Sequence, residues 1–369
     1  MLNKPGRPVW GAALLRWYGM HRRPLPWREN RDPYRIWVSE VMLQQTQVAT
    51  ATPHYRAFLA RFPSLERLAS ARLDQVLAAW SGLGYYRRAR NLHAAARQVV
   101  REHGGVVPRD PAAFERLPGV GRYTTGAVLS ISFDLPLPVL DGNVARVLSR
   151  FEALSFSVRE PRGARELWAR AAALVPARGA GDWNQALMEL GATVCKPVAP
   201  ACERCPVRRW CRAHALGRVE EFPPVEARRA TEAVRRAVAV IERDGKLLVA
   251  KRGRGVLEGL WEPPGVEIDP ARASRTPSTE HARVRRALAA ELSRLGITAR
   301  LERSDLEVRH TITHRRITVE MWRGALAPAT QRAATWRWVD PETPRIALTA
   351  LAKACAGQWC VAAPRVRRS

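Results

Sequence analysis

The spacing of apolar residues divides the chain into two halves. From Trp10 to about Leu216, apolar residues recur at every third or fourth position, as in LARFPSLERLASARLDQVLAAW and NVARVLSRFEAL. This spacing places apolar side chains on one face of a helix. The first half is therefore predicted to be all-α.

After about residue 234 the apolar residues follow a period of two. AVAVIERDGKLLVAKR contains two short apolar runs around Asp244-Gly245, a dipeptide typical of a two-residue β-hairpin turn. RRITVEMW alternates in the same way, whereas HARVRRALAAELSRLGI has helical spacing. The second half is predicted to be a small α+β domain.

A segment without periodic apolar residues separates the halves. Residues 216–234, LGRVEEFPPVEARRATEAV, contain paired prolines and charges of both signs, and are predicted to be a linker. We predict a helical domain over 1–215, with a cysteine-rich loop at 195–211, and a second domain over 235–369. The length of 369 residues suits two domains of about 100 to 200 residues each.

The chain carries a large positive charge. Lysine and arginine number 61 against 34 acidic residues, which gives a formal net charge of +27. Nearly all of the basic residues are arginine, which coding bias could explain, but such bias does not explain the shortage of acidic residues. The charge favours binding to a polyanion, of which nucleic acid is the commonest.

No apolar run approaches the about 18 residues of a membrane span. The apolar stretch near the N-terminus is interrupted by Gly11 and Arg16, so it lacks the layout of a signal peptide. We therefore expect a cytoplasmic protein with no membrane partner, associated with the nucleoid in a prokaryote.

Four of the six cysteines crowd into one short segment. Cys195, Cys202, Cys205 and Cys211 have the spacing C-x6-C-x2-C-x5-C. Four thiolates of this kind suit an iron-sulfur cluster, and they also suit zinc, although structural zinc sites usually contain two close cysteine pairs. The residues alone leave both metals open.

A glycine turn joins two predicted helices in LPGVGRYTTGAVLSISF. Gly119 and Gly121 permit a tight turn, and the backbone N–H groups at the start of the next helix can bind a phosphate oxygen without reading base sequence. An ordinary helix ended by glycine gives the same pattern. Both interpretations stay open at this point.

Two carboxylates stand in settings that can change their acidity. Glu40 lies among apolar residues in WVSEVMLQQTQV, where burial would raise its pKa and keep a proton available for donation. Asp141 and Asn143 precede an amphipathic helix in LPVLDGNVARVLSR. The alternatives are a solvated helix carboxylate for Glu40 and a helix N-cap for Asp141.

Together, the cysteine spacing and the LPGVG turn resemble the helix-hairpin-helix DNA glycosylase superfamily, whose endonuclease III and MutY branches carry a 4Fe-4S cluster. SEVMLQQTQV, GLGYYRRARNLHAAA and LDGNVARVL are similar to adenine DNA glycosylases of the MutY type nearly residue for residue. The resemblance runs from about Trp10 through Cys211. It implies one 4Fe-4S cluster on the four cysteines, with a structural and DNA-positioning role, and phosphate binding at the glycine turn.

The resemblance also implies catalytic roles. The glutamate that matches Glu40 protonates adenine, and the aspartate that matches Asp141 stabilises an oxocarbenium-like sugar or bonds transiently to it, as in two-carboxylate glycoside hydrolysis. Tyr123 is expected to lie beside the aspartate and help hold the site. Asn143 is expected to be the hydrogen-bond partner of the aspartate.

An enzyme that acts on a base must take that base out of the duplex. By resemblance, Gln45 and Tyr85 wedge or stack in the helix near the opposite base, while Arg28 and Gln185 line the adenine pocket. Core packing is the alternative for Tyr85, and a plain helix-surface position is the alternative for Gln185.

Position 123 bears on the type of reaction. Endonuclease III-like members carry there the lysine that forms a Schiff base with the sugar. This chain has Tyr123 and no lysine between Lys4 and Lys196. We expect a monomeric, monofunctional glycosylase of base excision repair that removes adenine opposite 8-oxoguanine or guanine in double-stranded DNA. A bifunctional glycosylase and lyase, or a non-catalytic iron-sulfur DNA-binding protein, is the alternative.

The second domain resembles the Nudix-like C-terminal domain of the MutY type, most clearly in GLWEPPGVEI. A Nudix box supplies glutamates for magnesium, but AAELSRLGI has Ala290, Ser293 and Arg294 at their positions. Nucleotide hydrolysis is therefore not expected, and recognition of 8-oxoguanine is. The loop that reads Phe-Ser-His in the family reads Ile-Thr-His here, so Thr313 retains a hydroxyl while an aromatic ring is lost.

Overall fold

The computed structural model describes residues 9–156, 160–224, 231–253, 257–269, 276–312, 314–327, 335–344 and 346–362. By their contacts, residues 1–71 and 88–227 form one compact unit, and residues 72–87 and 228–369 form the other. Among these described ranges, no helix is long and apolar enough to cross a membrane.

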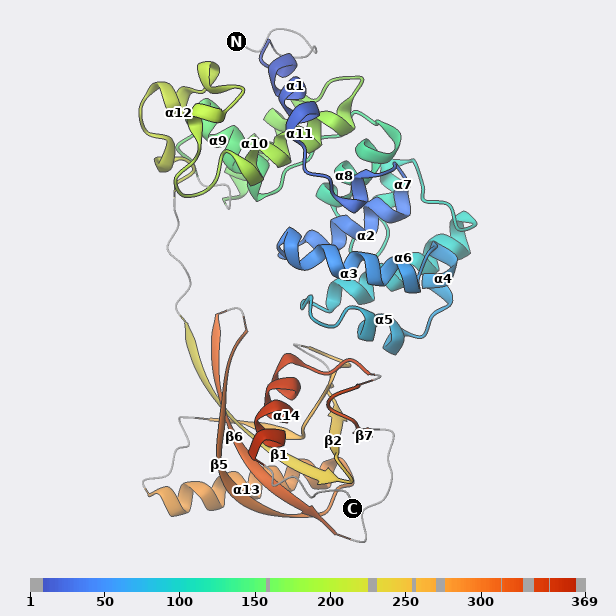
Figure 1. Cartoon of the computed structure of the whole chain (residues 1–369), viewed down its shortest axis with the longest axis vertical. Coiled ribbons are helices and arrows are strands. Elements are labelled where there is room, and N and C mark those ends of the chain that lie inside the picture. Colours follow the sequence, from blue (N-terminus) through green and yellow to red (C-terminus); the bar gives the residue numbers. More distant parts are fainter. Residues whose placement is uncertain are drawn as a thin grey trace. The chain divides into compact units, whose positions relative to one another are not determined.

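The described residues up to 224 form helices joined by loops (Figure 1), which confirms the predicted all-α half. The helices are α1 (Gly11–His21), η1 (Pro26–Arg28), α2 (Pro33–Leu43), α3 (Val48–Arg61), α4 (Leu65–Ser70), α5 (Leu73–Ala79), α6 (Arg87–His103), α7 (Pro111–Glu115), α8 (Arg122–Phe133), α9 (Gly142–Glu152), α10 (Pro161–Leu174), α11 (Ala180–Thr193), η2 (Cys202–Arg204), η3 (Arg208–Trp210), α12 (Arg212–Ala215) and η4 (Val219–Glu221).

Helices α8 and α11 are joined by polar contacts as well as by apolar packing. Asp134 ends α8 in the left-handed conformation, and its carboxylate accepts hydrogen bonds from the backbone N–H of Gly179 at 2.8 Å and of Gly181 at 3.2 Å. A Cβ on Gly181 would lie 2.5 Å from the Ser130 carbonyl oxygen, so only glycine permits this approach. Asn184 Nδ2 also donates to Ser130 Oγ at 2.9 Å. The two helices are therefore fixed relative to each other.

The rest of the described chain forms a mixed sheet with two helices, which confirms the predicted α+β half. Its elements are β1 (Glu232–Arg243), β2 (Lys246–Lys251), β3 (Trp261–Glu262), β4 (Gly265–Ile268), α13 (Pro277–Arg294), β5 (Ala299–Ile312), β6 (Arg315–Leu326), β7 (Trp336–Val339) and α14 (Ala350–Ala362). The strand order is β3-β2-β1-β6-β5, while β4 pairs with β1 and β7 with β2. Strands β1 and β6 are parallel, and the other pairs are antiparallel.

The predicted hairpin is present between β1 and β2. Arg243 pairs with Lys246, and the two residues between them have φ values of 53° at Asp244 and 71° at Gly245. Positive φ at both central positions is the geometry of a type I′ turn, whose twist matches that of the flanking strands.

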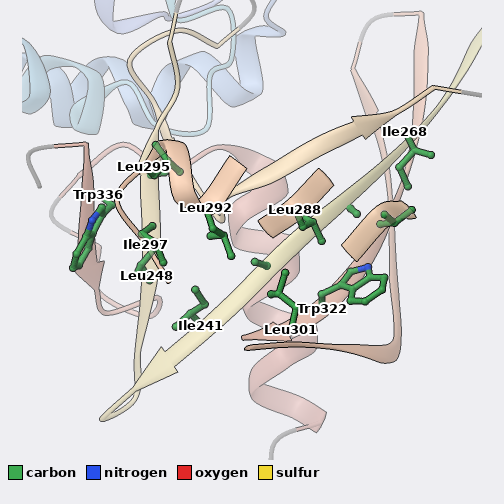
Figure 2. Close-up of a cluster of buried hydrophobic side chains, with 14 residues drawn as sticks. Ile241, Leu248, Ile268, Leu288, Leu292, Leu295, Ile297, Leu301, Trp322 and Trp336 are labelled. Carbon is green, nitrogen blue, oxygen red and sulfur yellow. The ribbon is translucent and has the colours of Figure 1, made fainter. Parts of the chain in front are cut away.

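The sheet has an apolar layer on each face. On one face, α13 packs Leu288 and Leu292 against Ile241 and Trp322 in the cluster of Figure 2. On the other face, α14 contributes to a second cluster that contains Val238, Val240, Val319, Leu351, Cys355 and Trp359. Alternate β1 side chains enter opposite clusters, which explains why this strand combines a period of two with nearly continuous apolar character.

The segment predicted as a linker differs in part from that prediction. Val219–Glu221 forms the helix η4, and Phe222 is buried with its carbonyl oxygen 2.9 Å from Arg150 Nε. Strand β1 already begins at Glu232. The paired prolines and mixed charge correctly indicated that no long helix forms in this segment. They did not predict that Phe222 is buried or that its carbonyl oxygen accepts a hydrogen bond from Arg150.

Candidate active site

A cavity of about 600 Å³ opens in the helical unit, within the size range of small-molecule sites. Its wall is formed by parts of α2, α8, α9 and α11 and by neighbouring loops. Seven residues predicted from the sequence line it: Arg28, Glu40, Gln45, Tyr123, Asp141, Asn143 and Gln185.

Glu40 is buried on the wall of this cavity. Its side chain lies near the end of α2 with 5% exposure, so the solvated alternative is wrong. Burial raises the pKa of Glu40 to about 7; a hydrogen bond from Tyr123 lowers it, nearby Asp141 raises it and Arg28 lowers it. Near neutral pH a large fraction of this carboxyl therefore carries a proton.

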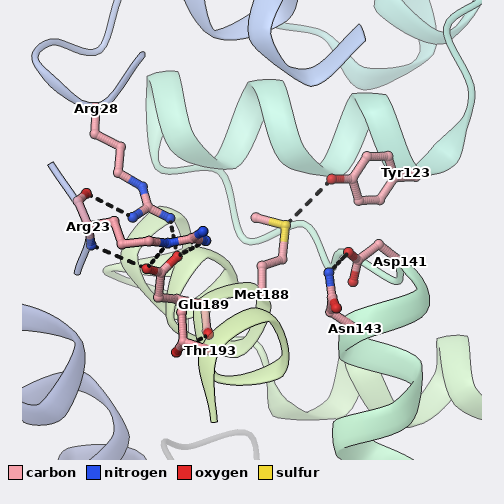
Figure 3. A network of polar contacts seen from close by, with 8 residues as sticks. All are labelled: Arg23, Arg28, Tyr123, Asp141, Asn143, Met188, Glu189 and Thr193. Atoms are coloured by element: carbon pink, nitrogen blue, oxygen red, sulfur yellow. Dashed lines mark hydrogen bonds and ion pairs between the residues drawn. The ribbon is translucent and has the colours of Figure 1, made fainter. Parts of the chain in front are cut away.

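Tyr123 is the direct hydrogen-bond partner of Glu40. Its hydroxyl, on the first turn of α8, donates to Glu40 Oε2 at 2.7 Å. The same hydroxyl lies 3.5 Å from Met188 Sδ (Figure 3). The resemblance placed Tyr123 beside Asp141; its direct bond is instead to the other carboxyl. Burial, followed by the charges of Glu40 and Asp141, raises the pKa of Tyr123 well above 10, so the phenol remains a neutral donor.

Asp141 is held through both of its carboxylate oxygens. Oδ1 accepts from the backbone N–H of Val144 at 2.7 Å, and Oδ2 accepts from Asn143 Nδ2 at 2.9 Å. The N-cap alternative and the expected contact with Asn143 therefore both apply. Burial raises the pKa of Asp141, while these hydrogen bonds act in the opposite direction.

Arg146 fixes the orientation of the Asn143 amide. Its Nη2 donates to Asn143 Oδ1 at 2.9 Å and to the Gly191 carbonyl oxygen at 2.8 Å, and its Nε donates to the Cys195 carbonyl oxygen at 2.8 Å. With the amide oxygen turned to Arg146, the amide nitrogen faces Asp141. Sequence analysis did not identify Arg146, because two of its partners, Gly191 and Cys195, lie more than 40 positions away in the chain.

A second buried glutamate on the cavity wall was also missed. Glu189 is 1% exposed and accepts four hydrogen bonds, three from Arg23 and one from Arg28, at 2.7 to 3.2 Å (Figure 3). Burial would raise its pKa, but the hydrogen bonds and charges of the two arginines bring it down to about 2. The apolar neighbours in ALMELG are the same signal that identified Glu40.

The residues expected to contact the duplex differ in placement. Gln45 is exposed, at a φ of 56° just after α2, and Gln185 is half-buried on α11. Tyr85 is 46% exposed at a φ of 46°, so core packing does not apply to it, although its neighbour Tyr86 is buried. Tyr85 is not among the residues that line the cavity. Thr313 lies outside the described residues.

The glycine turn lies between α7 and α8. Gly119 has a φ of 76°, and a Cβ there would lie 2.5 Å from Asn91 Cβ, so both backbone and packing require glycine. Gly121 is the N-cap of α8 with a φ of −124°, and a Cβ there would meet open space. A residue with a side chain would therefore fit at position 121 without backbone strain and without a clash with the described residues.

The four clustered cysteines line one small pocket together with Arg150. The guanidinium of Arg150 is buried and donates to the carbonyl oxygens of Lys196 and Pro197, and its Nη1 lies 3.5 Å from Cys195 Sγ. Burial raises the pKa of Cys205 to about 12. In the ranges for which side chains are described, no group of three or more His, Cys, Asp or Glu is placed to hold a single metal ion.

The helical unit with its glycine turn and carboxyl-lined cavity, followed by the α+β unit, defines a two-part base excision DNA repair protein. A family model described as "HhH-GPD superfamily base excision DNA repair protein" matches residues 38–170, and a NUDIX domain model matches residues 236–356. The chain belongs to the adenine DNA glycosylase family, as the resemblance predicted.

Two relatives and one solved structure illustrate the similarity. The adenine DNA glycosylase of Rattus norvegicus is 39% identical over 89% of this chain and 73% of that protein. The adenine DNA glycosylase of Homo sapiens is 37% identical over 90% of this chain and 70% of that protein. A thermostable thymine-DNA glycosylase superposes with a TM-score of 0.51 at 31% identity, covering 56% of this chain and 94% of the other.

Proposed function

We propose that this chain is a monofunctional DNA glycosylase of base excision repair, which hydrolyses the N-glycosidic bond of adenine mispaired with 8-oxoguanine or guanine in double-stranded DNA. The observation that carries the proposal is the pair of carboxyls in one cavity. Glu40 has a pKa of about 7, whereas Asp141 is held by two hydrogen bonds to its oxygens. Family membership supports adenine as the base.

Glu40 acts as the general acid. An adenine anion is a poor leaving group, so Glu40 transfers a proton to a ring nitrogen of adenine as the bond between C1′ and N9 breaks. The bonding electrons stay with the base, which leaves as neutral adenine. Because Tyr123 donates to Oε2, the transferred proton resides on Oε1.

Asp141 stabilises the positive charge that develops on the sugar. A carboxylate beside an oxocarbenium-like centre lowers the barrier by electrostatic attraction. The donors at Asn143 and Val144 favour its ionised form while Glu40 stays protonated, so two carboxyls in one cavity perform different tasks. Water then adds to C1′ and gives up a proton to Glu40. The product in the DNA is an abasic site.

None of the described residues that line the cavity is a lysine. A Schiff base with the sugar requires a lysine, and the sequence has none between Lys4 and Lys196. Tyr123, at the position where the lyase branch carries its lysine, is a neutral hydrogen-bond donor. The enzyme therefore stops at the abasic site.

Gln185 and Arg28 line the pocket for the extruded base. The half-buried amide of Gln185 offers both a donor and an acceptor to the edge of adenine. All four lone-pair positions of the Glu189 carboxylate already face donors from Arg23 and Arg28. We therefore assign Glu189 to positioning Arg28 rather than to binding the base.

The cysteine pocket would hold one 4Fe-4S cluster. Four cysteines line this one pocket, and four cysteine thiolates are the ligand set of such a cluster. Family membership supports iron-sulfur over zinc. When bound, the cluster would cross-link Cys195, Cys202, Cys205 and Cys211 and order the basic loop that carries them.

The glycine turn binds the DNA backbone. Gly121 has open space where a side chain would lie, and the N–H groups of the first turn of α8, which have no partner within the helix, are donors that suit a phosphate oxygen. Gln45 and Tyr85, both exposed, fill or stack in the space near the opposite base. The net charge of +27 supplies the attraction to the duplex.

Residues 235–369 recognise 8-oxoguanine, with Thr313 as one contact. Ala290, Ser293 and Arg294 lie on an exposed face of α13, where a Nudix hydrolase would need carboxylates for magnesium. This domain therefore binds an oxidised base without hydrolysing nucleotides. The protein acts as a monomer in the cytoplasm, and at the nucleoid if the cell is prokaryotic.

Single-turnover assays on duplexes with adenine opposite 8-oxoguanine, guanine or thymine test this function. We expect release of adenine from the first two, and strand breaks only after alkali. Equal breakage without alkali would overturn the monofunctional assignment, and no release from any duplex would overturn the glycosylase. Protein purified without oxygen should contain iron and absorb broadly in the visible range, whereas zinc without iron contradicts the cluster.

A further inference from the structure

The guanidinium of Arg88, on α6, lies at the carboxyl end of α2. Its Nη1 lies 2.8 Å from the carbonyl oxygens of both Val41 and Met42 and also donates to the carbonyl oxygen of Gln44. Its Nη2 donates to Thr46 Oγ1 at 3.2 Å. One side chain therefore contacts four acceptors along the last turn of α2 and the loop that follows.

These contacts replace hydrogen bonds that a continuing helix would supply. Helix α2 stops at Leu43, and the last carbonyls of any helix have no partner within it. A planar guanidinium presents five donors in a fixed fork, so Nη1 can face the carbonyls while Nη2 faces Thr46 Oγ1. The ammonium of lysine has three donors on one nitrogen and cannot hold both positions in this way. Arg88 thereby fixes the path of the chain as it leaves α2.

That path includes a disfavoured conformation at Gln45. Its φ of 56° lies in the left-handed region, which residues with a Cβ adopt only where the surrounding structure holds them there. Contacts of Arg88 with Gln44 and Thr46 bracket Gln45 on both sides. The Gln45 side chain is exposed and contributes to the wall of the cavity.

We infer that Arg88 is a positioning residue that holds Gln45 in its left-handed conformation, so that the side chain is already aimed before DNA binds. The inference rests on the proposed function, in which Gln45 fills space vacated in the duplex. A loop that is ordered in advance does not lose conformational entropy during base extrusion. Arg88 itself does not touch the base.

A double-mutant cycle tests this inference. Arg88→Lys keeps the charge but loses the fork, and Gln45→Gly permits positive φ without strain while removing the side chain. Single-turnover adenine release is measured for the wild type, both single variants and the double variant. Fluorescence of 2-aminopurine, placed at the target position opposite 8-oxoguanine, reports base extrusion separately from bond cleavage.

We expect Arg88→Lys to slow both extrusion and adenine release by about tenfold. In the Gln45→Gly background, the same change should cost no more than about twofold, because no side chain remains to be aimed. Arg87→Lys is the matched control on the same helix end. Arg87 is exposed, and this variant should retain the wild-type rates.

Thr46→Val tests the same inference if Arg88→Lys lowers the melting temperature of the protein below the temperature of the assay. It removes one acceptor with little change in shape and should slow extrusion by about twofold to threefold, again only when Gln45 is present. Equal penalties in both backgrounds would overturn the role of Arg88 while leaving the glycosylase intact. A wild type that releases no adenine would instead overturn the proposed function.

Discussion

Glu40 and Glu189 are both buried glutamates on the wall of one cavity, yet their acidities differ greatly. Glu40, on α2, has a pKa of about 7, and Glu189, on α11, has a pKa of about 2. Burial raises the pKa in both cases. The difference comes from the partners: Glu40 receives one hydrogen bond from a neutral phenol, whereas Glu189 receives four from two arginines.

Burial alone therefore does not identify a general acid. A buried carboxyl that receives no hydrogen bond from a cation can retain its proton and donate it, while one that is saturated by guanidinium groups remains an anion and orients them. The predictions below act on one member of this pair or on its partners.

The largest effect is expected from Glu40→Gln. The amide has the same shape but no acidic proton, so single-turnover adenine release should fall by about 1,000-fold. DNA affinity should remain unchanged. Glu29→Gln, at an exposed glutamate that follows Arg28 in the chain, is the control and should retain the wild-type rate. Unchanged release in Glu40→Gln contradicts the assignment of the acid.

Glu189→Gln should instead act on stability. Removing one partner of a buried ion pair leaves Arg23 and Arg28 facing an amide, which should cost about 3 kcal/mol of unfolding free energy at pH 7. Urea unfolding monitored by tryptophan fluorescence measures the change. Glu221→Gln breaks an exposed contact with Arg218 and should have little effect. If Glu189→Gln and Glu221→Gln lowered the unfolding free energy equally, the buried ion pair would not be the more stabilising one, which contradicts this prediction.

Glu189 and Glu40 should make the free energy of unfolding depend on pH in opposite directions. The pKa of Glu189 is lowered from 4.5 to about 2, so its contribution is present above pH 4.5 and is lost as the pH falls toward 2. The pKa of Glu40 is raised from 4.5 to about 7, so the protein loses up to about 3 kcal/mol as the pH rises through that window.

The contribution of Glu40 to the pH dependence of stability can be measured separately with the Glu40→Gln variant. Glu40→Gln should be more stable than the wild type at pH 8 and of similar stability at pH 4.5, in urea titrations at both values. A variant that is less stable than the wild type at pH 8 would contradict a protonated, buried Glu40.

The smallest effect is expected from Tyr123→Phe. Its hydrogen bond lowers the pKa of Glu40, so its removal should raise that pKa and move the alkaline decline of the rate to higher pH. The net hydrogen bond is worth about 1 kcal/mol, so the midpoint should move by less than about one pH value. A shift to lower pH would show that Tyr123 does not donate to the ionised carboxyl.

Sequence patterns correctly predicted the structural features that depend only on residues close together in the chain. The Asp244-Gly245 turn forms because both residues tolerate positive φ, and Asp141 caps α9 because its carboxylate reaches the N–H three residues ahead. The apolar surroundings of Glu40 correctly indicated burial. The family was predictable because residues that bind and react occur in short, recognisable segments.

Contacts between distant helices could not be predicted in the same way. Tyr123 and Glu40 are 83 positions apart, and Arg28 and Glu189 are 161 apart, so their pairing depends on how α2 packs with α8 and how η1 packs with α11. The placement of Arg88 against the end of α2 is of the same kind. Charge and periodicity indicate that such side chains exist, but only the fold determines which partners they meet.

The pH dependence of single-turnover adenine release from a duplex with adenine opposite 8-oxoguanine tests the central claim most directly. If Glu40 donates the proton, the rate should be constant at low pH and should fall about tenfold per pH value above a midpoint near 7. Glu40→Gln should lack this decline. A wild-type rate that stays constant from pH 6 to pH 9 would contradict a general acid at Glu40.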